Sequence, residues 1–415
     1  MSDIFRSDIQ NVIYGGDGIT HQNKQTIFIP NTLKGEAVTF KITNKNRGVL
    51  RGELYKINMP SPLRVSPPCA VSKECGGCAL QHMHLTAQAD LKTSWVFDAF
   101  KPFIQSNTEQ IKLTPHPSGF AGRRRVRWFK HDGKLGFRKR FSHDVVNTPT
   151  CIAITKNLDS LRQSLEALDL PSSIQSIQAV ELSNGTHIIL ESAQAKPDDF
   201  NPPHIDNQQW WWRKLDSPSI KALNKPTLAL FDRITLPNHT VIEILIGPND
   251  FVQGHAHGNQ TLIQQILTWA QGSQRIVDLF SGCGNLSLPL AQALNAQIEG
   301  AELNPASVKA ANTNAKRLGV DASYQTMDLF GSFDSQGFVG ADTLILDPPR
   351  KGAKRICQNI NQLFPKQVIM VNCDLGAAAR DAKALSQAGF KLKALRPLDL
   401  FPFTGHVEVL SLWAS

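Results

Sequence analysis

The seven cysteines of this chain fall into two groups whose spacing suits different chemistry. Three crowd into one Cys-x5-Cys-x2-Cys segment and four are scattered: Cys69, Cys75 and Cys78, then Cys151, Cys283, Cys357 and Cys373. The number is odd, and it is too small for the disulfide framework of a secreted protein. The thiols therefore point to metal ligation or to nucleophilic catalysis.

The crowded cysteines predict a metal site. Together with the distant Cys151 they form a set of four thiolates, which can hold either zinc or an iron–sulfur cluster. Structural zinc usually takes two close pairs of ligands, so three close cysteines and one distant one fit a cluster better. Gly76 and Gly77, which lie between two of the ligands, argue against three unrelated thiols.

A glycine-rich turn forms a second candidate site. Asp278-x-Phe280-x-Gly282-x-Gly284 follows an apolar run, and its glycines let the backbone approach a ligand closely. Glu302 ends the next apolar run, where a carboxylate can accept hydrogen bonds from ribose hydroxyls. Ser287 replaces the third glycine of a dinucleotide fingerprint, which favours a nucleoside without phosphates, such as S-adenosylmethionine. The alternative is an ordinary tight turn with a helix-capping acid.

The segment Asp347-Pro-Pro-Arg-Lys-Gly352 directly follows a third apolar run. Two successive prolines fix the backbone in an extended form and remove two hydrogen-bond donors. We therefore expect Asp347 to stand at a strand end, facing the same ligand as the glycine-rich turn. A rigid surface turn is the alternative interpretation.

These residues need a sheet to bring them together, and the pattern from about residue 240 onward supplies one. Strands are predicted at 275–280, 297–303, 343–347 and 368–373, helices from about 285, at 305–318 and at 376–388, and a closing antiparallel pair at 391–398 and 407–413. Such a βαβ series implies an α/β fold with a doubly wound sheet, whose ligands lie at the carboxyl ends of its strands.

The N-terminal part has a different texture. Short strands at 25–29, 37–43 and 52–57, separated by turn residues, predict a small β-barrel over residues 1–60. Four prolines between Pro60 and Pro68 indicate a boundary, and a helix is expected at 85–102. Asp132-Gly133 between two strand-like runs predicts a β-hairpin.

Charge is distributed unevenly along the 415 residues. Residues 1–150 hold 22 Lys+Arg and 11 Asp+Glu, a net charge of +11, whereas the remaining residues hold 22 and 24, a net charge of −2. An N-terminal excess of this size suggests a polyanionic partner, for which nucleic acid is the obvious candidate, although a bland basic surface is the alternative. No apolar run approaches the ~20 residues that span a bilayer, and no secretory signal begins the chain, so the cytoplasm is expected.

The basic excess peaks in the segment that ends at Arg140. Cations there are interleaved with Trp128, Phe129 and Phe137, and such a mixture neutralises phosphates while exposed rings stack on unpaired bases. Rings in the core beside merely solvated cations would be the alternative. The candidate RNA-binding residues are Arg123, Arg124, Arg125, Arg127, Lys130, Arg138, Lys139 and Arg140.

The combination of Asp278-Leu-Phe-Ser-Gly-Cys-Gly-Asn285, Asp347-Pro-Pro-Arg-Lys-Gly352, Cys373 after a strand and His406-Val-Glu408 resembles the RNA uracil-5-methyltransferases. The cysteine set and the small barrel resemble the branch that modifies 23S ribosomal RNA and carries a TRAM domain and a [4Fe-4S] cluster. The resemblance implies that the four metal ligands hold that cluster. It also implies a set of residues that contact the cofactor or the target base: Gln253, Phe280, Asn285, Glu302, Asp328 and Asp347.

The chemistry that this family performs needs covalent catalysis. Uracil C5 is a poor nucleophile, and adding a thiolate at C6 makes C5 part of an enolate. By resemblance, Cys373 is the nucleophile and Glu408 the base that removes the C5 proton. Without the resemblance, a lone cysteine after a buried strand is usually a small core residue, and Glu408 would be a solvated charge.

Two positions depart from the family pattern. Asn372-Cys373-Asp374-Leu375 stands where the family often has Ser-Cys-Asn-Pro, and His255 stands where an Asn commonly follows the glutamine by two. We expect Asp374 to raise the pKa of the neighbouring thiol by like-charge repulsion.

The sequence thus predicts three parts: a TRAM-like RNA-binding barrel at 1–60, a central iron–sulfur and RNA-binding domain at 61–240, and a methyltransferase domain at 241–415. The expected function is S-adenosylmethionine-dependent C5 methylation of one flipped or unpaired uridine in 23S rRNA by a monomer. The alternatives are a tRNA methyltransferase, a catalytically decayed RNA-binding protein, and an iron–sulfur redox enzyme. Trp210-Trp211-Trp212 suggests buried packing or a protein contact.

Overall fold

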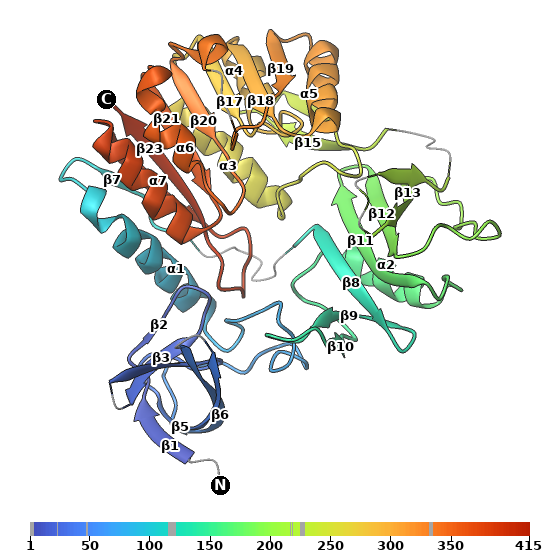
Figure 1. Cartoon of the computed structure of the whole chain (residues 1–415), viewed down its shortest axis with the longest axis vertical. Coiled ribbons are helices and arrows are strands. Elements are labelled where there is room, and N and C mark those ends of the chain that lie inside the picture. Colours follow the sequence, from blue (N-terminus) through green and yellow to red (C-terminus); the bar gives the residue numbers. More distant parts are fainter. Residues whose placement is uncertain are drawn as a thin grey trace.

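Three β-sheets follow one another along the chain (Figure 1). The computed structural model describes residues 4–22, 24–46, 49–114, 122–215, 217, 219–224, 229–331 and 335–415. In Figure 1 the N-terminal sheet lies at the bottom, the second sheet at the right and the largest sheet at the top. No helix within these ranges is long and apolar enough to cross a membrane.

The N-terminal sheet has six strands in the order β1-β5-β6-β4-β3-β2. Alternating residues of its strands turn inward, so that Ile27, Ile29, Val38 and Phe40 form a core of their own. The predicted short strands are confirmed, although two of them are longer than expected. The strands are β1 (Ile4–Asp8), β2 (Asn11–Val12), β3 (Gly18–Gln22), β4 (Gln25–Ile29), β5 (Ala37–Asn46) and β6 (Val49–Met59).

The second sheet has seven strands in the order β10-β9-β8-β11-β12-β13-β14. Asp132 and Gly133 form the predicted hairpin turn between β8 and β9, and both have positive φ, 47° and 72°, as two-residue hairpin loops require. Trp210 and Trp212 are buried in the core of this sheet, which explains the tryptophan run as packing. The elements are β8 (Arg125–His131), β9 (Lys134–Arg138), β10 (Val145–Asn147), α2 (Lys156–Glu166), β11 (Ile174–Leu182), β12 (Gly185–Ser192), β13 (Gln208–Lys214) and β14 (Ile220–Ala222).

The largest sheet has eight strands in the order β19-β18-β17-β20-β21-β23-β22-β7. Strands β17 to β21 pair in parallel, and β23 pairs antiparallel with β21 and β22, as the predicted βαβ series with a closing pair requires. The strands are β7 (Glu109–Gln110), β17 (Arg275–Leu279), β18 (Gln297–Glu302), β19 (Ala322–Thr326), β20 (Thr343–Leu346), β21 (Gln367–Asn372), β22 (Lys391–Leu398) and β23 (Glu408–Ala414).

Helices cover both faces of this sheet, because its central strands are apolar on both sides. Val277 packs into the core on the side of α1, α6 and α7, whereas its neighbour Ile276 packs into the core on the side of α3, α4 and α5. The helices are α1 (Leu85–Phe100), α3 (Ala256–Trp269), α4 (Ser287–Leu294), α5 (Pro305–Leu318), α6 (Lys354–Gln358) and α7 (Leu375–Gln387). The short strands β15 (Phe231–Thr235) and β16 (Val241–Leu245) pair separately, and single 3-10 turns occur at η1 (Lys101–Phe103), η2 (Gln336–Phe338) and η3 (Ile360–Gln362).

Part of the segment expected in the central domain packs on the largest sheet instead. Helix α1 contributes Trp95, Val96 and Phe100 to the core beneath β22 and β23, and β7 pairs with β22. Strands β22 and β23 present apolar side chains on this face of the sheet, and the apolar face of α1 covers them. Residues 85–110 therefore connect the N-terminal sheet directly to the largest one.

Candidate active site

The candidate active site lies at the carboxyl ends of β17, β18, β20 and β21, where the strand order reverses. In the turn after β17, Gly282 and Gly284 have φ values of 54° and 85°, which favour glycine. A Cβ atom on Gly282 would meet nothing within 4 Å, so the backbone there is open to a ligand. Phe280 has a φ of 70°, and a bulky residue in this conformation marks local backbone strain of the kind found at binding sites.

Asp278 lies beneath this turn and is 1% exposed. Neither carboxylate oxygen has a hydrogen-bond partner. Burial raises the pKa of Asp278 to about 7, the nearby Ser287 hydroxyl opposes this rise, and the charge of Glu302 adds to it. An unpartnered buried acid at a crevice fits a ligand that carries positive charge or hydrogen-bond donors.

Glu302, at the end of β18, ties the glycine turn to the helix that follows. Its carboxylate accepts from the backbone N–H of Gly282 at 3.3 Å and from that of Asn304 at 2.9 Å. The backbone carbonyl of Glu302 also accepts from Met327 at 2.9 Å, which sets Asp328 beside it. The three predicted residues Phe280, Glu302 and Asp328 are thereby brought to neighbouring strand ends.

Gln253 and Asp347 meet on the other side of the crevice. The side-chain amide of Gln253 donates to Asp347 at 3.2 Å. Burial raises the pKa of Asp347 well above its usual range, the charges of Glu408 and Asp278 add to the rise, and the Gln253 hydrogen bond opposes it. Asn285 instead exchanges two hydrogen bonds of 2.9 Å with Asn259 of α3, so its amide is held within the protein.

Strand register brings the predicted nucleophile and base together. Asn372, the last residue of β21, pairs with Val409 of β23. Continuing this antiparallel register by one residue places Cys373 opposite Glu408, and directly opposite residues project their side chains to the same face. Cys373 is half-buried and Glu408 is 6% exposed.

Electrostatics link this pair to the crevice. Burial raises the pKa of Cys373 to about 11, the carboxylates of Glu408 and Asp347 add to the rise, and the Arg350 guanidinium opposes it. Burial also raises the pKa of Glu408 to about 7, again opposed by Arg350. The site therefore holds a thiol and a carboxyl group whose pKa is near neutral, and the Arg350 guanidinium favours the charged form of both.

Comparison with known proteins identifies the family of this chain. Residues 8–55 match the TRAM domain and residues 247–369 match the methyltransferase small domain. The 23S rRNA (uracil(1939)-C(5))-methyltransferase RlmD of Shewanella halifaxensis is 30% identical over 420 residues, which covers 96% of this chain and 93% of that protein. The chain belongs to the RNA uracil-C5-methyltransferase family.

Other members of this uracil-C5-methyltransferase family are equally similar. The proteins of the same name from Shewanella sediminis and Vibrio vulnificus are 32% and 31% identical over 416 and 431 residues; the matches cover 96% and 98% of this chain and 93% and 95% of those proteins. The crystal structure of Pyrococcus abyssi tRNA (uracil-54, C5)-methyltransferase with S-adenosyl-L-homocysteine superimposes with a TM-score of 0.79. That match covers 99% of this chain and all of that one at 22% identity, which establishes the shared fold.

The two departures from the family pattern both prove to be helix caps. The Asp374 carboxylate accepts from the backbone N–H of Ala377 at 2.8 Å and so caps α7, a position that Asp and Asn fill about equally well. The pKa of the Cys373 thiol is raised, and its main causes are burial, Glu408 and Asp347, with Arg350 opposing them, so a contribution from Asp374 stays a prediction. His255 likewise caps α3 through Nδ1, which accepts from Gly258 at 3.2 Å.

No sequence pattern indicated the residues that hold the loop from Asp399 to Val407, which leads into Glu408. The Lys92 ammonium, buried on α1, donates to the Asp399 carboxylate at 2.8 Å and to the Phe401 carbonyl at 3.1 Å. Phe403 is bound through its backbone by Leu80 and by the Gln88 side chain. These partners lie about three hundred residues away along the chain, so only the folded structure reveals them.

The TRAM domain also contacts Cys373, the predicted nucleophile. Tyr14 donates its hydroxyl to the backbone carbonyl of Cys373 at 3.2 Å, and its ring packs edge-on against His406. Gly15 donates to the Gly405 carbonyl at 3.2 Å, and a Cβ atom on Gly405 would collide with Gly15 backbone atoms. The TRAM segment at Tyr14 and Gly15 therefore lies directly against the loop from Asp399 to Val407. No sequence pattern indicated this contact.

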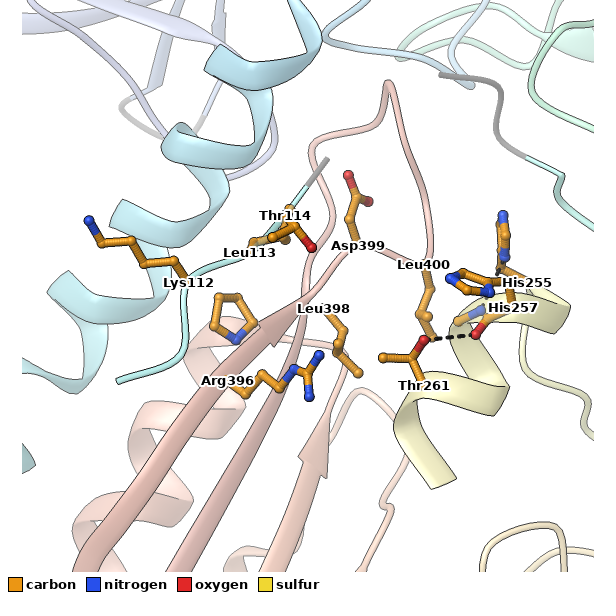
Figure 2. A pocket seen from close by; sticks show the side chains of 12 residues that line it. Lys112, Leu113, Thr114, His255, His257, Thr261, Arg396, Leu398, Asp399 and Leu400 are labelled. Carbon is orange, nitrogen blue, oxygen red and sulfur yellow. Dashed lines mark hydrogen bonds between the residues drawn. The ribbon is translucent and has the colours of Figure 1, made fainter. Parts of the chain in front are cut away.

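A separate pocket lies beside this loop, between the start of α3 and the end of β22 (Figure 2). Figure 2 shows Leu400 beside His255 and His257 on one side of it and Lys112 on the other, with Arg396 between them. Neither Cys373 nor Glu408 lines this pocket, so the pocket is not the catalytic crevice.

The four cysteines of the predicted cluster are half-buried and form no disulfide. Burial raises the pKa of Cys75, Cys78 and Cys151, the last to about 11, and neighbouring thiolates of the set add to each rise. Backbone N–H groups of Gly77, Ala153 and Ile154 and the Gln81 side chain oppose these rises by hydrogen bonding to sulfur.

This donor set fits an iron–sulfur cluster chemically, since four thiolates with N–H donors are what such clusters take. In the part of the chain that the structure describes, however, no three His, Cys, Asp or Glu side chains converge as a metal-binding group. Cys78 and Cys151 pack against a small core formed by Ala153 and by Phe403, which belongs to the loop from Asp399 to Val407. The cysteine region thus touches the loop that carries the base.

The arginine run contains one clear correction. Arg124 is 3% exposed, and its guanidinium donates to both oxygens of Asp232 at 2.7 and 2.6 Å. Its Nε also donates to the Gln253 carbonyl at 2.8 Å, so Arg124 supports the crevice from behind. The predicted RNA contact for Arg124 is therefore wrong, because a run of arginines does not reveal which member faces a buried carboxylate.

Other members of the predicted basic surface keep partial exposure. Arg127 and Lys139 have side chains that are 42% and 41% exposed, although each pairs with a glutamate. Arg138 stacks on the Phe129 ring, with its guanidinium carbon 4.1 Å from the ring centroid. Trp128 is fully buried, so the expected exposed ring at that position is wrong. The remaining predicted contacts lie on or beside the same strands: Arg123, Arg125, Lys130 and Arg140.

Proposed function

We propose that this protein transfers a methyl group to C5 of a uridine in 23S rRNA, using Cys373 as nucleophile and Glu408 as base. The observation that supports the proposal is the β21–β23 register, which pairs Asn372 with Val409 and, continued by one residue, brings Cys373 opposite Glu408. A nucleophile for C6 and a base for C5 must act on adjacent atoms of one ring, and opposed residues on neighbouring strands satisfy that demand.

The reaction balances through these two residues. The Cys373 thiolate forms a bond to C6 and makes C5 nucleophilic. S-adenosylmethionine, when bound, supplies the methyl group that C5 takes. Glu408 then removes the proton from C5, the electron pair reforms the C5–C6 double bond, and the C6–sulfur bond breaks to release the thiolate. Arg350 favours the anionic forms of both residues.

We infer that the cofactor occupies the crevice between Asp278 and Asp347. Gln253, Phe280, Asn285, Glu302, Asp328 and Asp347 remain the proposed contacts to cofactor or base. The unpartnered Asp278 carboxylate and the open backbone at Gly282 support this placement. Asn285 would act through its pairing with Asn259.

We further propose that Cys69, Cys75, Cys78 and Cys151 hold a [4Fe-4S] cluster. Its role would be structural, because Cys78 and Cys151 pack against the core of Ala153 and Phe403, and Phe403 belongs to the loop that leads into Glu408. Anaerobic reconstitution is expected to give four irons and four sulfides per chain, and far less in Cys151→Ser. Cys357→Ser, at a buried cysteine outside the set, is the control and should load fully. Full loading of Cys151→Ser would exclude this ligand set.

The substrate is assigned from the relatives, which are named for 23S rRNA. A flipped or unpaired uridine is expected, because thiolate addition at C6 requires access to one face of the base. Such a substrate places the enzyme in the cytoplasm, and a monomer suffices because one chain carries every proposed residue.

The test uses RNA labelled with tritium at uracil C5. Wild-type protein with S-adenosylmethionine should release tritium to water from 23S rRNA and not from tRNA. Release from tRNA alone would move the substrate to the tRNA alternative. Binding of rRNA without any release would indicate a non-catalytic RNA-binding protein.

A further inference from the structure

Phe141 combines two features that folding alone does not favour. Its side chain is 65% exposed, and its φ is 58°, in the left-handed region where a bulky residue is strained. A glycine would relieve this strain and would expose no apolar surface. A strained residue that gains little burial is a candidate for function.

The surroundings of Phe141 are built from three separate segments of the chain. The Arg51 guanidinium, from β6, stacks over the Phe141 ring with its central carbon 3.8 Å from the ring centroid. The Arg140 guanidinium lies 5.2 Å from the same centroid. Asp17, from the loop between β2 and β3, accepts hydrogen bonds from Arg51 at 3.0 Å and from Arg140 at 2.6 Å. The ring and the two cations are therefore held in one fixed arrangement.

The charges around the ring suit a polyanion. A single carboxylate, Asp17, is shared by two guanidinium groups, which leaves a net positive charge beside the exposed ring. The Arg51 and Arg140 side chains are 33% and 20% exposed, so both keep surface for a further contact. A flat ring bordered by guanidinium groups is what unpaired bases and their phosphates bind.

Cation–π attraction by itself does not explain why a phenylalanine occupies this strained, exposed position. At an exposed site its gain is about as large as the strain of the left-handed conformation, so the two effects nearly cancel. The protein thus gains little stability from Phe141, and a binding role gives the better account.

Phe141, Arg51 and Arg140 lie close to the active site. Asp17 lies three residues after Tyr14, whose hydroxyl binds the Cys373 carbonyl. Three residues span at most about 10 Å, so one short loop touches both the catalytic cysteine and the Arg51–Arg140 pair. A strand of RNA that delivers a uridine to Cys373 would pass Phe141 with a neighbouring nucleotide.

We propose that Phe141, with Arg51 and Arg140, is a stacking platform for an unpaired base that neighbours the target uridine. The platform rests on the proposed function only in that its ligand is the RNA substrate. Phe141 stacks on the base, and the two guanidinium groups contact the adjoining phosphates.

The test compares Phe141→Gly with Phe364→Gly. Phe364 is a matched control, because it too is an exposed phenylalanine with positive φ, at 71% exposure and 47°, but it precedes β21 at the end of the sheet opposite the crevice. Phe364→Gly should unfold at a slightly higher temperature than wild type, because it relieves the strain of the left-handed conformation. Phe141→Gly should change the unfolding temperature little, because it also loses the cation–π contacts that offset this strain. Only Phe141→Gly should weaken binding.

Two measurements give the expected result. The dissociation constant for a 23S rRNA fragment should rise between about fivefold and a hundredfold in Phe141→Gly, the range of one base–aromatic stack, and should stay unchanged in Phe364→Gly. Phe141→Trp should retain wild-type affinity. The rate of tritium release at saturating RNA should match wild type, while KM for RNA rises, because Phe141 takes no part in the chemistry.

Three outcomes separate this proposal from the proposed function. Unchanged affinity and KM in Phe141→Gly, with normal methylation, would overturn the platform alone. Wild-type protein that binds RNA through Phe141 but releases no tritium would overturn the methylation proposal and support the platform. An equal loss of affinity in Phe364→Gly would show that the effect is not local and would also overturn the platform.

Discussion

The cofactor crevice and the loop from Asp399 to Val407 meet at Glu408, yet they are built in opposite ways. The crevice contains acids whose interactions are incomplete: Asp278 has no hydrogen-bond partner, and burial raises the pKa of Asp278, Asp347 and Glu408. The loop is tied at several points, by Lys92 to Asp399 and Phe401, by Gln88 and Leu80 to Phe403, and by Gly15 to Gly405.

This difference indicates that the crevice is built to bind a ligand and that the loop is built to hold a fixed geometry. Unpaired buried acids destabilise the free protein, and a ligand that satisfies them gains affinity. The catalytic loop instead needs a fixed geometry before any ligand arrives, because the base must lie within reach of one particular proton. Long-range contacts to the N-terminal half supply that geometry.

The largest expected effect concerns the stability of the crevice without its ligand. The pKa of Asp278 is about 7 in the folded protein against 3.8 for an ordinary aspartate, so the folded state binds its proton more tightly. The contribution of Asp278 to the free energy of unfolding is therefore fully present below about pH 4. It is lost as the pH rises to about 7, by up to about 4 kcal/mol. Denaturant unfolding of cofactor-free protein across this range measures it. Asp278→Asn should reduce the slope of this dependence and leave the part that comes from Asp347 and Glu408, whose pKa values burial also raises. An unchanged slope would show that Asp278 does not contribute.

Breaking the loop anchor should reduce turnover without weakening cofactor binding. Lys92→Met leaves Asp399 without its cation and frees the Phe401 carbonyl, so we expect kcat to fall at least about tenfold. The dissociation constant for S-adenosylmethionine, measured by calorimetry, should change less than about twofold. Lys101→Met, at an exposed lysine just past the end of the same helix, is the control. A matching loss of cofactor affinity in Lys92→Met would contradict the separation of the two regions.

A substitution in the crevice should instead weaken cofactor binding and leave the Cys373 region unchanged. Glu302→Gln removes the charge that holds the Gly282 and Asn304 amides, and cofactor affinity should fall by about tenfold. Alkylation of Cys373 by iodoacetamide in the ligand-free protein should proceed at the wild-type rate. Glu299→Gln, on the same strand but paired with Arg275, should leave both properties intact. An altered alkylation rate in Glu302→Gln would mean that the regions are coupled.

The smallest effect is expected at Asp374. Its carboxylate caps α7, and asparagine caps helices equally well, so Asp374→Asn should change kcat less than about threefold. The pH dependence of Cys373 alkylation should also stay in place. A shift of that dependence toward lower pH would show that the Asp374 charge raises the pKa of the Cys373 thiol.

The crevice could be predicted from the sequence because its residues follow strand ends directly. Asp278, Glu302 and Asp347 come after short apolar runs, and parallel strands deliver their carboxyl ends to one edge. Arg350 stood in the same motif, but its effect on Cys373 and Glu408 depends on tertiary distances that spacing does not encode.

Contacts across the whole chain escaped sequence reasoning for the same physical reason. Tyr14 and Cys373 are 359 residues apart, and nothing in either segment marks the other as a partner. Arg124 looked like its neighbours in a basic run until the structure placed Asp232 against it. The cysteine spacing predicted a common neighbourhood, and the mutual pKa effects of these thiols agree with it, while cluster binding itself stays a prediction.

The most direct test of the Cys373–Glu408 pair is to stop the reaction between its two halves. Glu408→Gln should be mixed with 23S rRNA and S-adenosylmethionine, and protein–RNA adducts should be resolved on a denaturing gel and mapped by mass spectrometry. Because the C5 proton then has no base, a covalent adduct that joins Cys373 to a methylated uridine should accumulate, and Cys373→Ala should form none. Normal turnover by Glu408→Gln without any adduct, or an adduct in Cys373→Ala, would contradict the account.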